Sequence, residues 1–229
     1  MICQINPERE RPITEEVEPR YVIFDLDDTL VHSDAVREAF ACVARERGID
    51  AQAMSDTLDE LPGRPAREIF ESLGCSEQEA ITCTDRFLAR LDELNGALPT
   101  VAYADADQTL RALAKHSTLM LSTGSSPERA HQVLRQEGWD EFSVVLGSDE
   151  TCRKGSAHYE QLAQHAPDAK WVANAVTIGD SPADMRLGVE HGVPVRIGVD
   201  RRGDPWKLIN AGATHVVRSL RDVLTIIAV

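Results

Sequence analysis

The spacing of apolar positions changes along this chain and divides it into two kinds of segment. Residues 21–24 are continuously apolar and run into acids, which is typical of a buried strand with polar side chains at its carboxyl end. From residue 33 to about residue 96, apolar residues instead recur at helical spacing. The first helical stripe contains Val36, Phe40 and Val43, and the second contains Ile69, Phe70 and Leu73. The third contains Ile81, Thr84 and Phe87 and continues with Leu88, Leu91 and Leu94.

Beyond about residue 100, short apolar runs alternate with helical patterns. The strands that this pattern predicts cover residues 118–122, 143–146, 175–178, 193–199 and 214–217. The predicted helices cover residues 105–116, 127–137, 156–165, 182–191, 206–210 and 220–227. Such alternation favours an α/β fold, a doubly wound parallel sheet of Rossmann-like type with helices on both faces.

The same patterns predict three parts. Residues 1–20 are a polar lead-in, which we expect to be poorly ordered. Residues 21–32 and 97–229 form the α/β core, and residues 33–96 form an inserted helical domain. A turn at Leu61-Pro62-Gly63-Arg64-Pro65 breaks the helices of this insert.

Reactive side chains follow four of the predicted strands. Asp25 and Asp27 end the first strand, Thr123 ends the second, Lys154 lies in the loop after the third, and Asp180 ends the fourth. In open α/β sheets, ligands bind beyond the carboxyl ends of the strands. The sequence therefore predicts that these groups converge on one site.

Four acids would then gather in one crevice, namely Asp25, Asp27, Asp180 and Asp184. Carboxylates this close repel each other, and a hard divalent cation relieves the repulsion. Mg²⁺ is the expected cofactor, because it takes one or two carboxylates together with phosphate oxygens. Lys154 would place a positive charge beside a phosphoryl group.

Other groups fit the same chemistry. Thr123 and the backbone amides of Gly124 and Ser125 would donate hydrogen bonds to phosphate oxygens at a helix N-terminus. A carboxylate such as Asp25 is also a competent covalent nucleophile. If the chain stays extended, Asp27 points to the same face as Asp25 and can act as general acid and base.

Each of these residues also has a structural interpretation. A lone aspartate at a strand end is more often a helix cap or a turn former, and we treat Asp28 as structural. Asp184 could simply be a first-turn charge on its helix. Arg64, in the Pro-Gly-Arg-Pro turn, is a candidate for contacting a substrate, but it could equally be a solvated arginine.

Composition narrows the function classes. The chain has 229 residues and a formal net charge of −14, which argues against nucleic-acid binding. It has no membrane-spanning apolar stretch and no secretory signal at its start. Its five cysteines are widely spaced without a Cys-x-x-Cys pair, which favours reduced thiols in the cytoplasm over disulfides or a zinc site. A monomer and a homodimer are both compatible with the sequence.

The motifs resemble those of the haloacid dehalogenase (HAD) superfamily, in order and over nearly the whole chain after residue 20. The four similar blocks are Asp25-Leu26-Asp27-Asp28-Thr29, Leu121-Ser122-Thr123-Gly124, Lys154, and Gly179-Asp180-Ser181-Pro182-Ala183-Asp184. The helical insert resembles the C1 cap of the phosphoglycolate phosphatase and β-phosphoglucomutase branch.

The resemblance implies a role for each residue. Asp25 would be the nucleophile and Asp27 the general acid and base, while Thr123 and Lys154 would hold the phosphoryl group. Asp180 and Asp184 would bind Mg²⁺ together with the Asp25 carboxylate and the Asp27 carbonyl. The implied activity is a phosphatase acting on a small phosphorylated metabolite through an aspartyl-phosphate.

The sequence departs from the family pattern at three places. The third motif usually reads Lys-Pro-x-Pro but is Lys154-Gly155-Ser156-Ala157 here, His32 stands where an acid is frequent, and Ala104-Asp105 replaces a Pro-Gly turn. None of these changes removes a reacting group, but all three weaken assignment to one subfamily.

Several alternatives remain within and beyond this family. Asp27 argues against a true dehalogenase, and the absence of lysine between Leu30 and Lys115 argues against a Schiff-base hydrolase. A sugar phosphomutase uses the same acids and stays open. A non-catalytic binding protein on the same fold is disfavoured by the intact acids.

Overall fold

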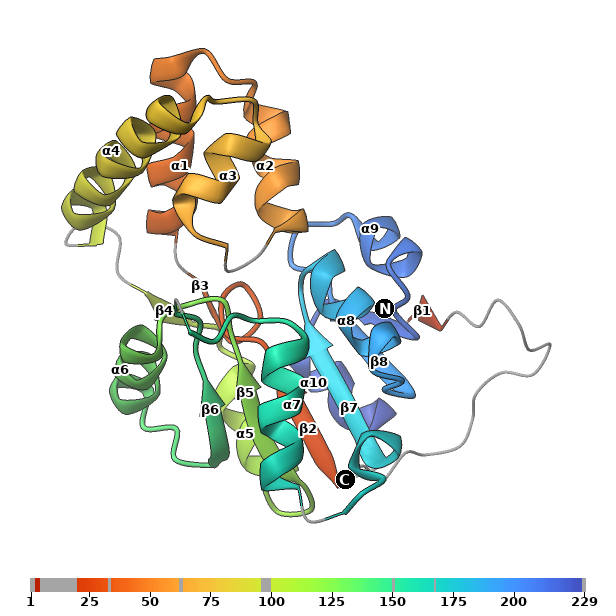
Figure 1. Cartoon of the computed structure of the whole chain (residues 1–229). Coiled ribbons are helices and arrows are strands. Elements are labelled where there is room, and N and C mark those ends of the chain that lie inside the picture. The colour runs from red at the N-terminus through yellow and green to blue at the C-terminus, as the bar shows by residue number, and fades with distance from the viewer. Residues whose placement is uncertain are drawn as a thin grey trace. The chain divides into compact units, whose positions relative to one another are not determined.

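The computed structural model describes residues 3–4, 20–32, 34–61, 64–95, 100–149, 151–166 and 168–227. The chain divides into two compact units (Figure 1). We call Met1–Val31 with Ala102–Val229 the core unit, and His32–Val101 the helical unit. The chain passes between them at β3 (Val31–His32) and β4 (Val101–Ala102), which pair in a small two-stranded sheet.

Within the described residues, the core unit holds a seven-stranded sheet in the order β1-β9-β8-β7-β2-β5-β6. Its strands are β1 (Cys3–Gln4), β2 (Tyr21–Phe24), β5 (Thr118–Ser122), β6 (Phe142–Leu146), β7 (Ala175–Gly179), β8 (Val195–Val199) and β9 (His215–Val217). All pairs from β9 to β6 are parallel, which confirms the predicted fold class.

The first strand is the exception to the parallel order. β1 pairs antiparallel with β9, with Cys3 opposite Val216 and Gln4 opposite His215. The expectation of a poorly ordered lead-in is therefore wrong at these two residues, because backbone pairing to a sheet edge does not depend on an apolar pattern. The rest of that lead-in up to residue 19 lies outside the described residues.

Period-two alternation along β2 builds both halves of the core. Val22 and Phe24 pack into one buried cluster, whereas Tyr21 and Ile23 pack into another on the opposite face. All four side chains are at most 2% exposed, because β2 lies between β7 and β5 and both of its faces are covered.

Helices cover both faces of the sheet, as expected (Figure 1). Side chains of α5 (Ala106–Leu113), α6 (Pro127–Glu137) and α10 (Leu220–Ile226) join the cluster of Val22 and Phe24. Side chains of α7 (Ser156–His165), α8 (Pro182–Glu190) and the 3₁₀ turn η1 (Trp171–Asn174) join or pack against the other. A further helix, α9 (Pro205–Asn210), packs with α8 and β9.

The helical unit consists, over its described residues, of helices around their own apolar cluster. These are α1 (Asp34–Arg47), α2 (Ala51–Glu60), α3 (Ala66–Ser72) and α4 (Glu77–Asn95). Phe40 and Phe87 stack in its centre with ring centroids 4.1 Å apart. Leu88, which the sequence pattern placed on the buried stripe, is 54% exposed, because Phe87 occupies the inward position instead.

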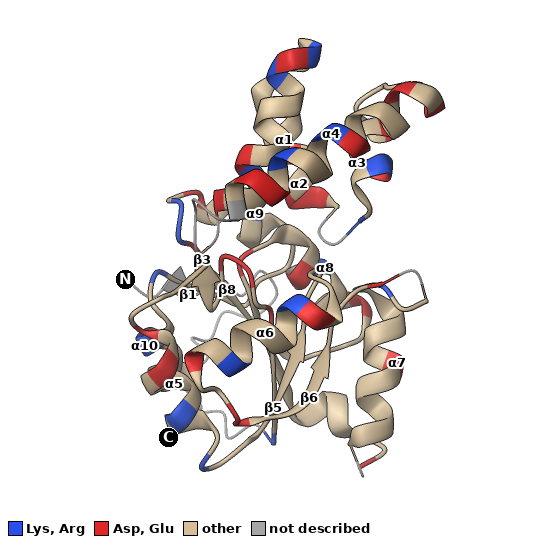
Figure 2. Ribbon diagram, turned by 90° about the vertical axis from the view of Figure 1, so that its left-hand side faces the viewer, with Lys and Arg blue, Asp and Glu red and all other residues tan. Residues whose placement is uncertain are grey.

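Charged residues of both signs lie along α1, α3 and α4, whereas the charged residues of α2 are all acidic (Figure 2). Arg47 pairs with Glu79 at 2.8 Å, and Arg86 pairs with Glu46 at 2.9 Å. Such exposed pairs contribute little stability each. Over the described residues, none of the helices is both long and apolar enough to cross a membrane.

Candidate active site

Backbone pairing carries the reactive residues past the ends of their strands. The amide of Asp25 donates to the carbonyl of Ile178 at 2.9 Å, so the pairing of β2 with β7 continues one residue beyond β2. The amide of Thr123 donates to the carbonyl of Leu146 at 2.9 Å, which does the same for β5 and β6. Asp25 and Thr123 are thereby fixed at the same edge of the sheet.

After Asp25 the chain turns at once. The amides of Leu30 and Val31 both donate to the carbonyl of Leu26, at 2.8 and 3.1 Å. Asp28 adopts a φ of 59°, a left-handed conformation that aspartate tolerates better than most residues. The chain is therefore not extended here, and Asp25 and Asp27 do not share surroundings as simple strand alternation would require.

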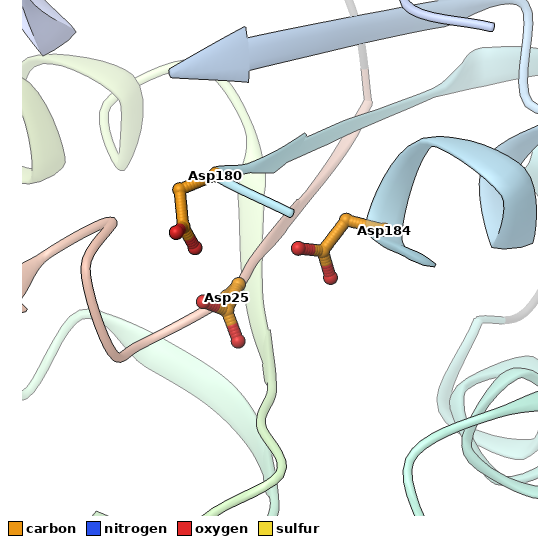
Figure 3. A group of neighbouring side chains, drawn as sticks. All are labelled: Asp25, Asp180 and Asp184. Atoms are coloured by element: carbon orange, nitrogen blue, oxygen red, sulfur yellow. The ribbon is translucent and has the colours of Figure 1, made fainter. Parts of the chain in front are cut away.

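Three carboxylates and one lysine meet beyond the strand ends. Asp25, Asp180 and Asp184 offer oxygens that all lie within 4.8 Å of one another (Figure 3). The Nζ atom of Lys154 lies 2.6 Å from Oδ1 of Asp25 and 2.6 Å from Oδ1 of Asp184. We call Asp25, Asp180, Asp184 and Lys154 the buried acidic cluster.

Burial sets the electrostatics of this cluster. Burial raises the pKa of the Asp25 carboxyl to about 7, against the opposing pull of Lys154. Burial, together with the charges of Asp25 and Asp28, raises the pKa of Asp180 well above its usual range. Although burial disfavours the charged lysine, Asp184 and Asp25 raise the pKa of Lys154 above its usual range. The cluster is therefore short of positive charge.

Asp184 has a structural role as well. It is the N3 residue of α8, and its Oδ2 atom accepts hydrogen bonds from the hydroxyl of Ser181 at 2.6 Å and the Ser181 amide at 3.2 Å. This is a capping box, which fixes both the helix start and the carboxylate. A Cβ atom on Gly179 would lie 2.5 Å from Asp184 Oδ2, so glycine is required for this close approach.

Ser148 ties the loop of Lys154 to the end of β5. Its hydroxyl donates to the carbonyl of Thr123 at 2.9 Å and accepts from the amide of Lys154 at 2.9 Å. Thr123 itself is fully buried, and its Oγ1 atom accepts from the amide of Ser125 at 3.0 Å. That amide, which the sequence suggested for phosphate binding, is thus already hydrogen-bonded to Thr123.

The carboxylate of Asp27 has its own partners. Its Oδ2 atom accepts from the hydroxyl of Ser125 at 2.5 Å, and its Oδ1 atom accepts from the guanidinium of Arg129 at 2.6 Å. Arg129 Nε also donates to Ser125 Oγ at 3.0 Å. We call Asp27, Ser125 and Arg129 the Asp27 triad. Gly124 lies half-buried in the same loop, just before the start of α6.

Arg64 belongs to the helical unit and pairs there with Glu68 at 3.2 Å. The pair is exposed and spans one helical turn at the start of α3. Arg64 is thus a cation on the surface of its own unit.

A family model matches the stretch of sequence that contains these residues. The profile described as "Haloacid dehalogenase-like hydrolase" matches residues 22–197, which include both groups of residues defined above. The chain belongs to the haloacid dehalogenase-like hydrolase family. No curated protein matches it in a direct search.

Solved structures share the fold of this haloacid dehalogenase-like chain over most of its length. A haloacid dehalogenase-like family protein from Streptococcus pneumoniae has a TM-score of 0.71 and 21% identity, and covers 91% of this chain and 98% of its own. A predicted phosphoglycolate phosphatase from Haemophilus somnus has a TM-score of 0.70 and 18% identity; the match covers 92% of this chain and 98% of that protein. A protein provisionally called a β-phosphoglucomutase, from Bacteroides vulgatus, has a TM-score of 0.70 and 17% identity; the match covers 92% of this chain and 88% of that protein.

Three residues that contact this candidate site were not predicted from the sequence, namely Thr29, Ser148 and Arg129. Thr29 donates towards Asp25 Oδ2 at 3.2 Å and Asp180 Oδ1 at 3.3 Å, and its position within the first motif was the available signal. Ser148 and Arg129 had weaker signals. Ser148 is a small polar residue just past a strand, and Arg129 lies one helical turn after Ser125.

Proposed function

We propose that the protein is a Mg²⁺-dependent phosphatase that hydrolyses a small phosphorylated metabolite through a phosphoryl group carried on Asp25. The observation that carries the proposal is the buried acidic cluster, where a carboxylate at a strand end lies against a lysine and two further acids. Buried charges in this density are costly to folding, and they are retained where chemistry needs them.

The donor set fits magnesium. With all groups ionised, three carboxylates and one ammonium leave a net charge of two negative units within the cluster. Only oxygen atoms are offered, which suits a hard cation that keeps some of its waters. Asp25 and Asp180 would hold Mg²⁺ with the carbonyl of Asp27, and Asp184 would complete the site. The ion, when bound, would neutralise charge on the phosphoryl oxygens.

Asp25 would make the first bond. An oxygen of its carboxylate would attack phosphorus while the bond from phosphorus to the ester oxygen breaks. Asp27 would donate a proton to the departing oxygen, and the alcohol would leave. Asp27 would then take a proton from water as this water attacks phosphorus, which releases phosphate and restores Asp25.

Other groups would hold the phosphoryl group in place. Lys154 supplies a fixed positive charge, because two carboxylates hold its ammonium and its pKa keeps it protonated. Thr123 and Gly124 lie before the N-terminus of α6, where backbone amides favour an anion. Thr123 would direct its hydroxyl hydrogen to a phosphoryl oxygen, since its oxygen already accepts from Ser125.

The helical unit would serve as a cap that excludes water during transfer and opens to release the product. Under this proposal residues 33–96 are the cap, and residues 21–32 with 97–229 are the catalytic core. Arg64 would contact the substrate from the cap, where its charge suits an anionic group. The names of the structural neighbours from Haemophilus somnus and Bacteroides vulgatus support a phosphatase or a sugar phosphomutase on this plan.

Phosphate release tests the function. The purified protein is incubated with p-nitrophenyl phosphate and with a panel of phosphorylated metabolites, in Mg²⁺ and in EDTA. We expect Mg²⁺-dependent release of inorganic phosphate from at least one metabolite. Conversion of a sugar phosphate into an isomer, followed by ³¹P NMR without phosphate release, would favour the mutase instead. Absence of both reactions would overturn the proposal.

A further inference from the structure

Both oxygens of the Asp27 carboxylate are held by side chains of the core unit. Arg129 donates to Oδ1 at 2.6 Å, and Ser125 donates to Oδ2 at 2.5 Å. The two partners are themselves joined, because Arg129 Nε donates to Ser125 Oγ at 3.0 Å. The triad is therefore a closed ring of hydrogen bonds that leaves the carboxylate little freedom to rotate.

The start of α6 places Arg129 for this contact. Ser126 is the N-cap residue, and its hydroxyl accepts from the amide of Arg129 at 3.2 Å. Pro127 at the first turn fixes the entry of the helix. Side chains of a helix lean toward its N-terminus, so the Arg129 side chain reaches back over Ser125 to Asp27. It is 26% exposed, so this partly sheltered contact is less screened than a surface pair.

The two partners differ in what they tolerate. A guanidinium can only donate, so Oδ1 of Asp27 must remain an acceptor as long as Arg129 is bound to it. A hydroxyl both donates and accepts, so Ser125 can stay hydrogen-bonded to Oδ2 whether or not this oxygen carries a proton. The proton that Asp27 exchanges would therefore reside on Oδ2.

We propose that Arg129 is a positioning residue, which fixes the Asp27 carboxylate so that Oδ2 delivers the proton to the leaving oxygen. This inference rests on the proposed phosphatase function. In the step concerned, the bond from phosphorus to the ester oxygen breaks, that oxygen takes the proton of Asp27, and Asp27 is left as a carboxylate beside Arg129. The contribution of Arg129 grows with the need of the leaving group for a proton.

The test compares two leaving groups. An alkyl phosphate must protonate its departing alkoxide, whereas p-nitrophenolate departs without a proton. The alkyl probe is the ester that the wild type hydrolyses fastest in the metabolite panel. The kcat/KM value is measured for both esters, because it reports the steps up to departure of the leaving group and excludes hydrolysis of the phosphoryl enzyme. Wild type without activity on either ester would refute the phosphatase itself, separately from Arg129.

Three variants complete the design. We expect Arg129→Met to lower kcat/KM by about 30-fold for the alkyl ester and by less than about threefold for p-nitrophenyl phosphate. Arg129→Lys keeps the positive charge but replaces the two separate donor nitrogens that contact Asp27 and Ser125 by a single ammonium, so it should give an intermediate ratio. Arg135→Met removes an exposed arginine of the same helix and should leave both values unchanged.

Two outcomes contradict the inference. One is an equal fall for both esters in Arg129→Met, which would make Arg129 a general contributor to structure or to phosphate binding. The other is a pair of values indistinguishable from those of Arg135→Met. Thermal unfolding of each variant shows whether it is folded, and the ratio of the two kcat/KM values is independent of the fraction of active protein.

Discussion

The two aspartates of the first motif are two residues apart, yet they have opposite surroundings. Asp25 lies in the buried acidic cluster, where burial raises its pKa to about 7 and Lys154 is its charged partner. Asp27 lies in the Asp27 triad, whose carboxylate and guanidinium side chains are 36% and 26% exposed. These different surroundings fit the different roles proposed for the two aspartates, because a nucleophile must attack directly and an acid must exchange protons.

The largest effect should come from removing Asp25, the proposed nucleophile. Asp25→Asn keeps the shape of the side chain but replaces the attacking carboxylate by an amide, so we expect a loss of about 10³-fold or more in kcat. Steady-state phosphate release in saturating Mg²⁺ measures it. Asp140→Asn, an exposed change in the same unit, is the control and should retain wild-type activity. Near-normal turnover by Asp25→Asn would remove the basis for contrasting the two aspartates.

Lys154→Met should have the next largest effect, on both activity and stability. It leaves Asp25 and Asp184 without their ammonium partner, and breaking a buried pair in this way costs about 3–5 kcal/mol. We expect kcat/KM to fall by about 10²-fold because the phosphoryl group loses a fixed charge. Kinetics and urea unfolding measure the two losses. The exposed Lys115→Met serves as control, and equal behaviour of the two variants would contradict the role of the cluster.

Asp180→Asn, studied in metal-free protein, tests how the charges around Asp25 affect the stability of the fold. The folded-state pKa of Asp25 lies near 7, above its unfolded value of 3.8, so the folded state binds more protons between these values. The free energy of unfolding therefore falls as the pH rises from about 4 to about 7. Asp180 adds to this fall, because its pKa is raised as well.

Replacing the Asp180 carboxylate by an amide should relieve the repulsion between the negative charges of Asp180 and Asp25. In EDTA at pH 7, the variant should melt above the wild type by about 2–4 °C for each kcal/mol gained, and the difference should shrink toward pH 4. Added Mg²⁺ should raise the melting temperature of the wild type and have little effect on the variant. A wild type that is insensitive to Mg²⁺ at pH 7 would contradict the proposed metal site.

Ser148→Ala should give the smallest of these effects. It removes one hydrogen bond to the Thr123 carbonyl and one from the Lys154 amide, which together contribute about 1–3 kcal/mol. We expect a fall in kcat of about fivefold, since Lys154 keeps its ion pairs but loses part of its backbone support. Ser148→Thr keeps the hydroxyl group and should recover activity. A Ser148→Ala variant as active as the wild type would show that the Lys154 loop does not need the hydrogen bonds of Ser148.

The sequence predicted the parts of this molecule that depend on pattern along the chain. Strand and helix periods located β2, β5 and β7 within a residue of their observed bounds, because both faces of these strands are buried. The order of Thr123, Lys154 and Asp180 after successive strands was equally readable, since parallel strands end at one edge.

Contacts across the fold were not readable in the same way. The pairing of Arg129 with Asp27 joins residues 102 apart in the sequence, and neither residue's neighbours indicate it. The prediction that Asp25 and Asp27 point to the same face of an extended strand was also wrong. The chain turns at Asp28, whose left-handed backbone changes the direction of the chain. Leu88 was misplaced for a related reason, as the adjacent Phe87 fits the centre of the helical unit better.

The most direct test of the account uses Asp27→Asn with p-nitrophenyl phosphate in Mg²⁺. This leaving group departs without a proton, but under the proposed roles the variant cannot activate water, so the phosphoryl enzyme should accumulate. Intact-protein mass spectrometry after acid quenching should show one added phosphoryl group, absent in Asp25→Asn/Asp27→Asn. Borohydride reduction followed by peptide sequencing should place this group on Asp25. A phosphoryl group on another residue, or no phosphoryl enzyme despite release of p-nitrophenol, would contradict the division of roles between the two aspartates.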